Sequence, residues 1–412
     1  MASMNENSTS RRLFLKFLAA SPLLAYAGVA AQAADRPSIL EALEGAADLI
    51  TSPGEAINVF DFEPVARKNI SPAHFGYLAS GIDSEVTLRA NREAFSRYYL
   101  RPRRLYDVSR VDTSIELFGV KYATPIILAP TGGNKAFHPE GEVAVAKGAR
   151  KGGHLLILAT PATTSVEEAT AARGAPIWFQ LYATPSWPIA HTLVKRAESA
   201  GCPVVVVTVD RLAGRNQETF ERLRRRDPRD CTTCHSPGIQ GQLRRRPMFD
   251  GIDLSGLTSF QSANMTWDFI QRLRAATTMK IVIKGILTEE DAARCVESGA
   301  DGVIVSSHGG RGEDSGRATL DCLPEVVSAV GGRLPVLVDS GFRRGTDIVM
   351  ALAMGAQGVC IGRPYLWGLG AFGQAGVEQV LQILRTELEV AMKQCGVRSR
   401  QELTPAFVRR AL

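Results

Sequence analysis

Short apolar runs that alternate with helix-like segments dominate the chain from Tyr122 onward. Each run is rich in β-branched residues, ends in a small or polar residue and precedes a helical pattern of about 10–20 residues. The eight runs are Pro125–Thr131, Leu155–Thr160, Ile177–Tyr182, Val204–Asp210, Ile281–Gly285, Val303–His308, Val336–Ser340 and Val359–Gly362. Eight consecutive strand–helix units predict a (β/α)8 TIM barrel of the α/β class.

A doubly wound open sheet is the alternative fold. It would need a phosphate-binding glycine fingerprint after the first strand, and Pro130-Thr131-Gly132-Gly133 does not match that pattern. Ahead of the barrel, residues from Asp35 to about Lys121 read as an N-terminal segment of helices and loops. The 412 residues are 45% hydrophobic and 22% charged, which is ordinary globular composition. No apolar run reaches the roughly 18–20 residues of a membrane span.

The first 34 residues resemble a twin-arginine export signal. Ser10-Arg11-Arg12-Leu13-Phe14-Leu15-Lys16 precedes a moderately apolar stretch that ends in Ala31-Gln32-Ala33, an A-x-A cleavage pattern. We therefore assign residues 1–34 to a signal peptide and 35–412 to the mature barrel domain; an N-terminal anchor helix is the alternative. Because twin-arginine export carries folded proteins, typically with a cofactor loaded, the signal predicts a periplasmic cofactor protein, with access to the inner membrane surface.

One connection is longer than a barrel requires. About 70 residues separate the fourth predicted strand from the fifth, and we treat 211–266 as an insertion loop on the active-site face. Residues 211–250 hold ten arginines against five acidic residues, with clusters at Arg224-Arg225-Arg226 and Arg244-Arg245-Arg246. Two interpretations stay open: docking to an acidic partner or an anionic membrane surface, and a loop that is merely solvated. Nucleic acid is not expected as a partner in the periplasm.

The insertion contains Cys231-Thr232-Thr233-Cys234-His235, the attachment pattern of haem c. Two thiols would bind the haem covalently, and His235 would be an axial ligand. The predicted compartment suits haem c, but haem c is normally attached to unfolded exported chains, whereas this signal implies folded export. A redox-active or disulfide-bonded pair of Cys231 and Cys234 is the alternative. A zinc site lacks a second pair of ligands, so we predict no metal site.

Hydrogen-bonding and charged residues gather at the carboxyl ends of the predicted strands, which converge on one site in a barrel. Seven of the eight ends carry such groups, and burying them without partners would cost about 1–3 kcal/mol each. Asp339-x-Gly341-x-Arg343 and Gly362-Arg363 follow the last two strands, where barrels commonly bind phosphate. Glycine admits backbone N–H groups to the phosphate oxygens, and arginine adds bidentate charge.

A second group at the strand ends can handle protons. It consists of His308 with Asp210, together with Lys284, Tyr182 and Arg311. An aspartate beside a histidine fixes the tautomer and stabilises the imidazolium ion. A fixed lysine can stabilise negative charge as it develops, and an arginine can bind a carboxylate with two parallel hydrogen bonds.

These residues lie in motifs that resemble the FMN-dependent L-2-hydroxy acid dehydrogenase and oxidase family. That family includes glycolate oxidase, lactate oxidase, mandelate dehydrogenase and the flavocytochrome lactate dehydrogenases. The resemblance runs from about Phe60 to Leu403. It rests on Tyr77-Leu78-Ala79-Ser80-Gly81, Ala129-Pro130-Thr131, His138-Pro139-Glu140-Gly141-Glu142, Phe179-Gln180-Leu181-Tyr182, Thr208-Val209-Asp210, Ile283-Lys284-Gly285, Ser306-Ser307-His308-Gly309-Gly310-Arg311, Asp339-Ser340-Gly341-Phe342-Arg343-Arg344-Gly345 and Ile361-Gly362-Arg363-Pro364.

The resemblance implies a role for each matching residue. His308 takes the substrate proton with Asp210 hydrogen-bonded behind it, Tyr182 binds the hydroxyl oxygen, and Lys284 lies against flavin N1 and O2. Arg311 and Tyr77 hold the substrate carboxylate. The implied FMN-binding residues are Thr131, Gly132, Gln180, Thr208, Lys284, Ser306, Asp339, Gly341, Arg343, Gly362 and Arg363.

The sequence also departs from the family pattern. Ala159 stands where a serine is usual near the flavin, and Pro161 stands where an aromatic residue often lines the substrate pocket. A second substrate-binding arginine is expected after Asp210, and Arg215 is the candidate for it. These departures leave the substrate open. Gly132 resembles the mandelate dehydrogenase pattern more than the alanine common in oxidases, which favours a dehydrogenase.

The resemblance predicts oxidation of a small, lactate-like L-2-hydroxy acid to the 2-oxo acid. Electrons would pass to a cytochrome or a respiratory component of the membrane. The alternatives are an oxidase that makes peroxide from oxygen, a flavin-carrying electron-transfer or binding protein without hydroxy acid activity, and an FMN barrel isomerase. FMN is the expected cofactor, with haem c as a second candidate. Relatives often form tetramers, so the resemblance also implies a homo-oligomer.

Overall fold

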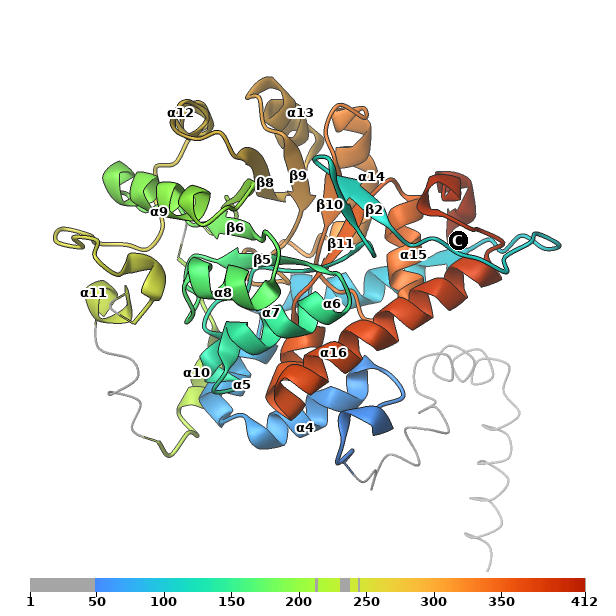
Figure 1. Ribbon diagram of the computed structural model, residues 1–412, viewed down its shortest axis with the longest axis horizontal. Helices are drawn as coiled ribbons and strands as arrows, with labels where there is room; N and C mark the ends of the chain where they lie inside the picture. The colour runs from blue at the N-terminus through green and yellow to red at the C-terminus, as the bar shows by residue number, and fades with distance from the viewer. Residues whose placement is uncertain (1–48, 212–213, 230–237, 244, 412) are drawn as a thin grey trace, which may run out of the picture. The chain divides into compact units, whose positions relative to one another are not determined.

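The computed structural model describes residues 49–211, 214–229, 238–243 and 245–411, and every element below lies in these ranges (Figure 1). The predicted signal peptide and the motif from Cys231 to His235 lie outside the described residues.

Eight parallel strands close into a barrel, with β11 paired to β4. The strands are β4 (Ile126–Leu128), β5 (Leu155–Ala159), β6 (Trp178–Leu181), β7 (Val204–Thr208), β8 (Lys280–Ile286), β9 (Gly302–Val305), β10 (Val336–Val338) and β11 (Gly358–Ile361). Each predicted run coincides with one of these strands in chain order, so the predicted TIM barrel is confirmed. The strands form because β-branched and other apolar residues run without interruption where a strand is buried on both faces, as in Val204–Thr208.

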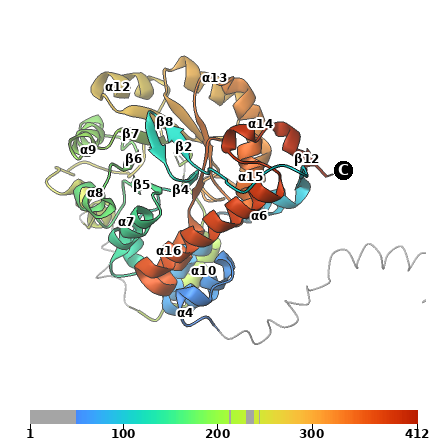
Figure 2. The same cartoon turned by 45° about the vertical axis from the view of Figure 1, so that its right-hand side comes forward.

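Helices follow the strands and surround the barrel (Figure 2). They are α7 (Gly141–Lys151), α8 (Val166–Arg173), α9 (Trp187–Ser199), α12 (Asp268–Ala276), α13 (Glu289–Glu297), α14 (Thr319–Val330), α15 (Gly345–Ala353) and α16 (Arg363–Gln394), with the 3-10 helix η5 (Asn134–Ala136) before α7. Side-chain caps start two of them: Ser165 accepts a hydrogen bond from the Glu168 amide, and Thr288 from the Asp291 amide. The backbone of α16 bends at Phe372 and Gly373, where the dihedral angles are not helical.

The N-terminal segment is largely helical, as expected. It contains η2 (Pro53–Glu55), η3 (Val59–Asp61), α4 (Phe62–Asn69), α5 (Pro72–Ala79), α6 (Val86–Glu93) and η4 (Ala94–Arg97). β1 (Tyr98–Leu100) then pairs antiparallel with β12 (Val408–Arg410), which follows η7 (Arg400–Glu402) and η8 (Pro405–Phe407). The hairpin of β2 (Ile115–Leu117) and β3 (Val120–Tyr122) contributes Ile115, Leu117 and Tyr122 to the cluster that fills the barrel interior.

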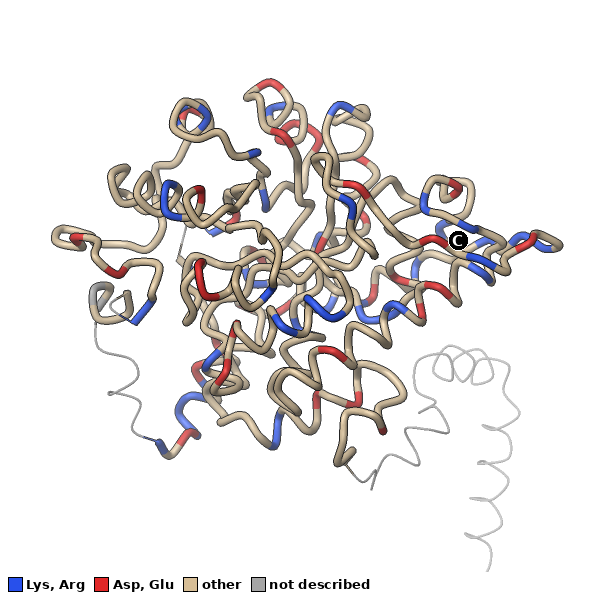
Figure 3. The backbone as a smooth tube through the Cα atoms, viewed as in Figure 1, with Lys and Arg blue, Asp and Glu red and all other residues tan. Residues whose placement is uncertain are grey.

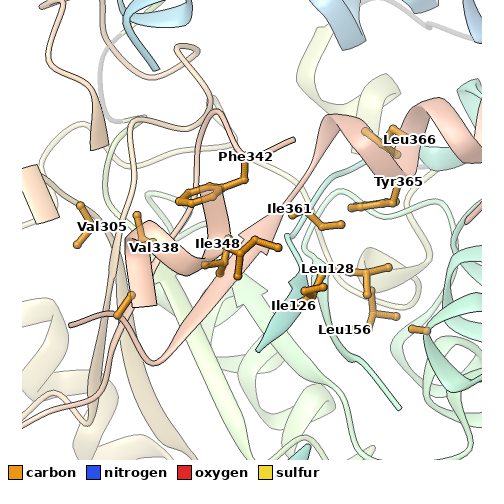
Figure 4. Packing of buried hydrophobic residues seen from close by; sticks show 14 of the residues in the cluster. Ile126, Leu128, Leu156, Val305, Val338, Phe342, Ile348, Ile361, Tyr365 and Leu366 are labelled. Atoms are coloured by element: carbon orange, nitrogen blue, oxygen red, sulfur yellow. The ribbon is translucent and has the colours of Figure 1, made fainter. Parts of the chain in front are cut away.

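The larger hydrophobic core lies between the strands and the surrounding helices. Figure 4 shows part of it, in which Ile126 and Leu128 of β4 lie close to Ile361 of β11 and Tyr365 of α16. The five cysteines outside the CxxCH motif are all buried and unpaired: Cys202, Cys295, Cys322, Cys360 and Cys395. Among the described residues, no helix combines the length and the apolar character that a membrane crossing requires.

The described part of the basic insertion contains α10 (Glu218–Arg224), α11 (Gly238–Leu243) and η6 (Pro247–Phe249). Within α10 the charges are locally paired, since Arg222 lies 2.8 Å from Glu218 and Arg224 lies 2.8 Å from Glu221. Figure 3 shows blue and red residues near each other in the region of α10. Part of the positive charge of the insertion is therefore balanced within its own helix, although such exposed pairs stabilise the fold little.

A stability prediction follows from the contact between α15 and α16. A Cβ atom on Gly345 would lie 2.2 Å from the backbone carbon of Glu387, so Gly345→Ala must push the two helices apart. We expect the free energy of unfolding to fall by about 1–3 kcal/mol, as overpacking does elsewhere. Urea denaturation followed by circular dichroism measures it. Gly54→Ala is the matched control, because a Cβ there meets nothing within 4 Å; equal stability of the two variants would contradict the prediction.

Candidate active site

A cavity of about 840 Å³, measured out to its open mouth, lies at the carboxyl ends of the barrel strands. Twelve of the residues predicted for the site line it: Tyr77, Thr131, Gly132, Tyr182, Lys284, His308, Arg311, Asp339, Gly341, Arg343, Gly362 and Arg363. Residues from strand ends far apart in the sequence are therefore brought together.

His308 and Asp210 form a hydrogen-bonded pair beside this cavity. The Nδ1 atom of His308 lies 2.8 Å from Oδ1 of Asp210, and its Nε2 atom lies 3.2 Å from the hydroxyl of Tyr182. Two glycines make room for the carboxylate. A Cβ atom on Gly285 would lie 2.7 Å from the Cβ of Asp210, and one on Gly312 would lie 2.8 Å from its carbonyl oxygen. His308 itself has a left-handed backbone with φ of 56°, uncommon for a residue other than glycine.

The protonation state of this pair suits a base. Burial lowers the pKa of His308 to about 3, against the opposing effect of the Asp210 carboxylate. Burial also acts to raise the pKa of Asp210, but the neighbouring His308 and Lys284 outweigh it and hold that pKa at about 2. At neutral pH, Asp210 is therefore ionised and accepts the hydrogen bond from Nδ1 of a neutral His308. The Nε2 atom, which lies 3.2 Å from the Tyr182 hydroxyl, is then unprotonated and can accept a proton.

Lys284 of β8 is a buried cation with two buried carboxylates nearby. Its Nζ atom lies 3.4 Å from Asp339 and 3.7 Å from Asp210, and it donates a hydrogen bond of 2.8 Å to Ser306. Burial alone would lower the pKa of Lys284, but the charges of Asp339 and Asp210 raise it above its ordinary value. Ser306 in turn donates to Asp339 at 2.9 Å, which fixes the position of that carboxylate.

Arg311 presents a free hydrogen-bond donor in the cavity. Its guanidinium carbon lies 4.5 Å from the centre of the Tyr77 ring. One nitrogen donates to the carbonyl oxygens of Tyr77 and Ser80, while Nη2 is buried and has no partner among the described residues. A buried, unpaired donor of this kind is costly unless an anion meets it. The position therefore suits the carboxylate of a substrate, as the family resemblance implied.

Arg343 and Arg363 provide a second anion site at the ends of β10 and β11. Arg363 donates to three backbone carbonyls at 3.0 Å, and Arg343 donates to the carbonyl of Phe342 at 2.9 Å. Neither guanidinium lies within 4.0 Å of a carboxylate in the described part of the chain. Burial lowers the pKa of Arg343 to about 9, with Arg363 adding to the effect, and burial lowers the pKa of Arg363 to about 10.

The backbone beside these arginines is open to a ligand. A Cβ atom on Gly362, which directly follows β11, would meet only Thr131, at 3.8 Å, so the space beside this glycine is open. The buried Arg343 and the part-buried Arg363, neither of which lies within 4.0 Å of a carboxylate in the described residues, fit the phosphate group of FMN together with the open space at Gly362. Thr131, Gly132 and Asp339 line the same cavity, and their polar groups suit a flavin ring.

Three predicted flavin-binding residues lie beneath the cavity wall and do not line it. Gln180 donates to the hydroxyl of Thr208 at 2.9 Å, and both side chains are buried. Ser306 is fully buried between Lys284 and Asp339. The structure therefore places these three next to the site, and their contact with FMN stays a prediction.

The second arginine at the cavity differs from the sequence-based candidate. Arg211 lines the cavity and donates to the Tyr182 hydroxyl at 3.2 Å, whereas Arg215 is not part of the lining and has a buried Nη1 atom without a partner. The sequence did contain a signal for Arg211, because it directly follows Asp210 at the end of β7. Pro161 lines the cavity as expected, and a Cβ atom on Gly132 would lie 2.5 Å from its ring. Gly132 is therefore the residue that fits beside Pro161.

In the described part of the chain, no three acidic, histidine or cysteine side chains form a group that could hold a metal ion. The chemistry visible in the site is that of anion binding and proton transfer.

Comparisons with known proteins agree with this geometry. Residues 66–410 match the family described as FMN-dependent dehydrogenase. A peroxisomal (S)-2-hydroxy-acid oxidase of Oryza sativa subsp. japonica is 41% identical over 85% of this chain and 95% of the rice protein. A soluble mutant of the membrane-associated (S)-mandelate dehydrogenase of Pseudomonas putida is 35% identical, with a TM-score of 0.79 over 87% of this chain and all of that one.

A mandelate oxidase mutant solved with (S)-mandelic acid is 36% identical, with a TM-score of 0.73 over 87% of this chain and 99% of the oxidase. The fold and site thus define an FMN-dependent oxidoreductase that acts on 2-hydroxy acids. The chain belongs to the FMN-dependent dehydrogenase family.

The phosphate site can be tested by FMN affinity. Arg343→Gln should raise the dissociation constant of FMN roughly 10- to 100-fold, because a hydrogen bond to a charged group contributes about 1.5–3 kcal/mol. Flavin fluorescence during titration of the apoprotein measures it. Arg344→Gln is the control, since that side chain is 42% exposed and pairs with Glu387. Equal FMN affinity in the two variants would show that Arg343 does not bind the phosphate group of FMN.

The depressed pKa of His308 predicts an unusual pH profile. A protonated His308 cannot accept a proton, so activity is lost as pH falls through its pKa in the folded enzyme. Because burial lowers that pKa to about 3, kcat/KM should stay level from pH 8 to about pH 5 and fall only below that. Samples held at each pH and assayed again at neutral pH control for unfolding. A fall centred near the ordinary histidine value of about 6.5 would contradict the predicted effect of burial.

Proposed function

We propose that the enzyme oxidises a small L-2-hydroxy acid to the 2-oxo acid and passes the electrons to a cytochrome or another respiratory acceptor. One observation carries the reaction: His308, whose Nε2 atom is unprotonated, and Arg311, whose Nη2 atom has no partner among the described residues, line the same cavity as the phosphate site. A hydroxy acid can meet both groups at once, because its carboxylate and its hydroxyl are on adjacent carbons. L-Lactate is the first compound to test.

The residues have distinct parts in this proposal. Arg311 and Tyr77 hold the carboxylate, and the Tyr182 hydroxyl, which accepts a hydrogen bond from Arg211, positions the substrate oxygen. His308 accepts a proton at Nε2, and the resulting imidazolium ion is stabilised by the ionised Asp210 at 2.8 Å. The positive charge of Lys284 would lie next to the flavin ring, where it would stabilise negative charge as it develops. When bound, FMN accepts the two electrons that leave the substrate carbon.

Two features favour an acceptor other than oxygen. Gly132 is the dehydrogenase-like residue of the cavity wall, and the predicted twin-arginine signal would deliver the protein to the periplasm, close to the respiratory chain. The motif of Cys231, Cys234 and His235 would supply a haem c as the next electron carrier. An oxidase remains the second candidate, because the rice and mandelate oxidases are similar to this chain over most of its length.

Anaerobic flavin reduction tests the reaction. L-Lactate, followed by a panel of L-2-hydroxy acids, should bleach the flavin of the mature holoprotein. His308→Gln should keep its flavin but slow the bleaching by roughly 10²–10⁴-fold, the usual contribution of a general base. Asp210→Asn serves as a second variant that leaves the imidazole in place. Bleaching of His308→Gln at the parental rate would rule out this proton acceptor, and a bound flavin that no hydroxy acid bleaches would support the electron-transfer alternative.

The same reduced protein identifies the acceptor. Rapid reoxidation by cytochrome c and slow reoxidation by air are expected for a dehydrogenase. Peroxide formed at the rate of substrate loss would instead establish the oxidase. Expression with haem-maturation machinery tests whether Cys231 and Cys234 bind haem c. If the purified protein shows no Soret band, the two cysteines form a thiol pair or a disulfide instead.

A further inference from the structure

The loop after β10 is held by an arginine that comes from outside the barrel. This loop, residues 341–344, contributes Gly341 and Arg343 to the cavity wall, and we call it the phosphate loop. Arg92 belongs to α6 in the N-terminal segment. Its Nη1 atom donates both to the carbonyl oxygen of Gly341 and to Oδ2 of Asp347, the latter at 2.8 Å. A single nitrogen therefore contacts the phosphate loop and the helix that follows it.

Asp347 extends this contact to Arg343. Asp347 lies in the first turn of α15 and is only 4% exposed. Its Oδ2 atom accepts hydrogen bonds from the backbone amides of Arg343, at 2.9 Å, and Arg344, at 3.1 Å. Arg92 thus holds the phosphate loop at two points, directly at Gly341 and through Asp347 at Arg343.

The charge of Arg92 matters as well as its position. Among the lysines and arginines of the described residues, only Arg92 has a side-chain nitrogen within 4.0 Å of the Asp347 carboxylate. Without Arg92, a buried negative charge would lie against the same backbone that is to receive a phosphate group. Like charges repel strongly where water is excluded, so the loss of Arg92 would weaken the binding of a phosphate in particular.

The helix that carries Arg92 is itself fixed against the barrel. A Cβ atom on Gly341 would lie 2.2 Å from the backbone carbonyl oxygen of Asn91, so α6 and the phosphate loop are in close contact. The side chain of Asn91 is buried. It donates to the Ser307 hydroxyl, after β9, at 2.9 Å and accepts from the Thr319 amide at 3.1 Å. The residue before Arg92 therefore anchors it to two further parts of the barrel.

We propose that Arg92 is a positioning residue for the phosphate group of FMN. It holds the loop that carries Arg343 and compensates the charge of Asp347, so that the loop presents net positive charge to the phosphate. Arg92 does not line the cavity, and it acts through the loop and not by touching the cofactor. This role in retaining the cofactor does not depend on which 2-hydroxy acid the enzyme oxidises.

The preference of the apoprotein for FMN over riboflavin tests this role, because the two flavins differ only in the phosphate. Flavin fluorescence during titration gives both dissociation constants. Arg92→Met removes the charge but keeps an unbranched stem beside Phe95, whose ring centre lies 5.2 Å from the Arg92 guanidinium carbon. The preference for FMN should fall roughly tenfold or more, with the dissociation constant of riboflavin within about twofold of the parent value. Arg92→Lys should recover most of the preference, since one nitrogen makes both contacts.

Arg97→Met is the matched control. Arg97 belongs to η4 of the same segment, and its side chain is 36% exposed against 35% for Arg92. It pairs with Asp321 in the first turn of α14, and neither residue lines the cavity. The control should bind both flavins as the parent does. An unchanged preference for FMN in Arg92→Met would overturn the proposal. Equal losses of affinity for FMN and riboflavin would also overturn it, because they would indicate a general structural role.

A double variant tests whether Arg92 acts through Asp347. Asp347→Asn removes the negative charge but keeps an oxygen that can accept from the Arg343 amide. Added to Arg92→Met, it should recover part of the lost preference for FMN. No recovery would contradict the role given to the charge of Asp347. If Arg343→Gln also left the preference for FMN unchanged, the phosphate site itself would be wrong, which separates the two possible failures.

The holoenzyme provides a second measurement. Flavin fluorescence rises as FMN is released after dilution, so the release rate can be followed without a substrate. Arg92→Met should release FMN roughly tenfold or more faster than the parent, and Arg97→Met should release it at the parental rate. Circular dichroism of each variant controls for unfolding. Equal release rates in the two methionine variants would overturn the proposal.

Discussion

The Nζ atom of Lys284 lies 3.4 Å from one buried carboxylate, Asp339, and 3.7 Å from another, Asp210. This arrangement sets the charge of the whole site, because an isolated buried ion would be neutralised by a shift in its pKa. Asp339 keeps Lys284 cationic, and Lys284 helps to keep Asp210 ionised and able to hold His308. Loss of Lys284 would leave the two buried carboxylates without the cation between them.

Much of the fold and site could be predicted from the sequence because the signals are local. A buried parallel strand is a continuous apolar run, and the polar residue that ends it marks the active-site face, as with Asp210 and His308. The pairing of β1 with β12 had no such signal, since Tyr98 and Arg410 are far apart in the chain and the strands are short. Whether Arg211 or Arg215 reaches the cavity depends on the path of an irregular connection. Such a segment has no helical or strand periodicity from which the direction of a side chain could be inferred.

The site divides its tasks between two kinds of structure. Groups that move protons or hold fixed charge belong to the rigid strand ends, where Lys284 lies on β8 and Asp210 and His308 follow β7 and β9. The long connection after β7 adds Arg211, which lines the cavity next to these groups. The sequence showed that this connection is basic, but not which parts of the fold its arginines approach. In the folded chain, Nη1 of Arg246 lies 3.5 Å from the position of a Cβ atom on Gly133, in the loop after β4.

The direct pairing of β7 with β8 has an evolutionary consequence. These strands are hydrogen-bonded in register from Val204 with Lys280 to Thr208 with Lys284, so the long segment between them does not set their alignment. Insertions, deletions or wholesale exchange of that segment can therefore accumulate in descendants while the proton-handling residues keep their places.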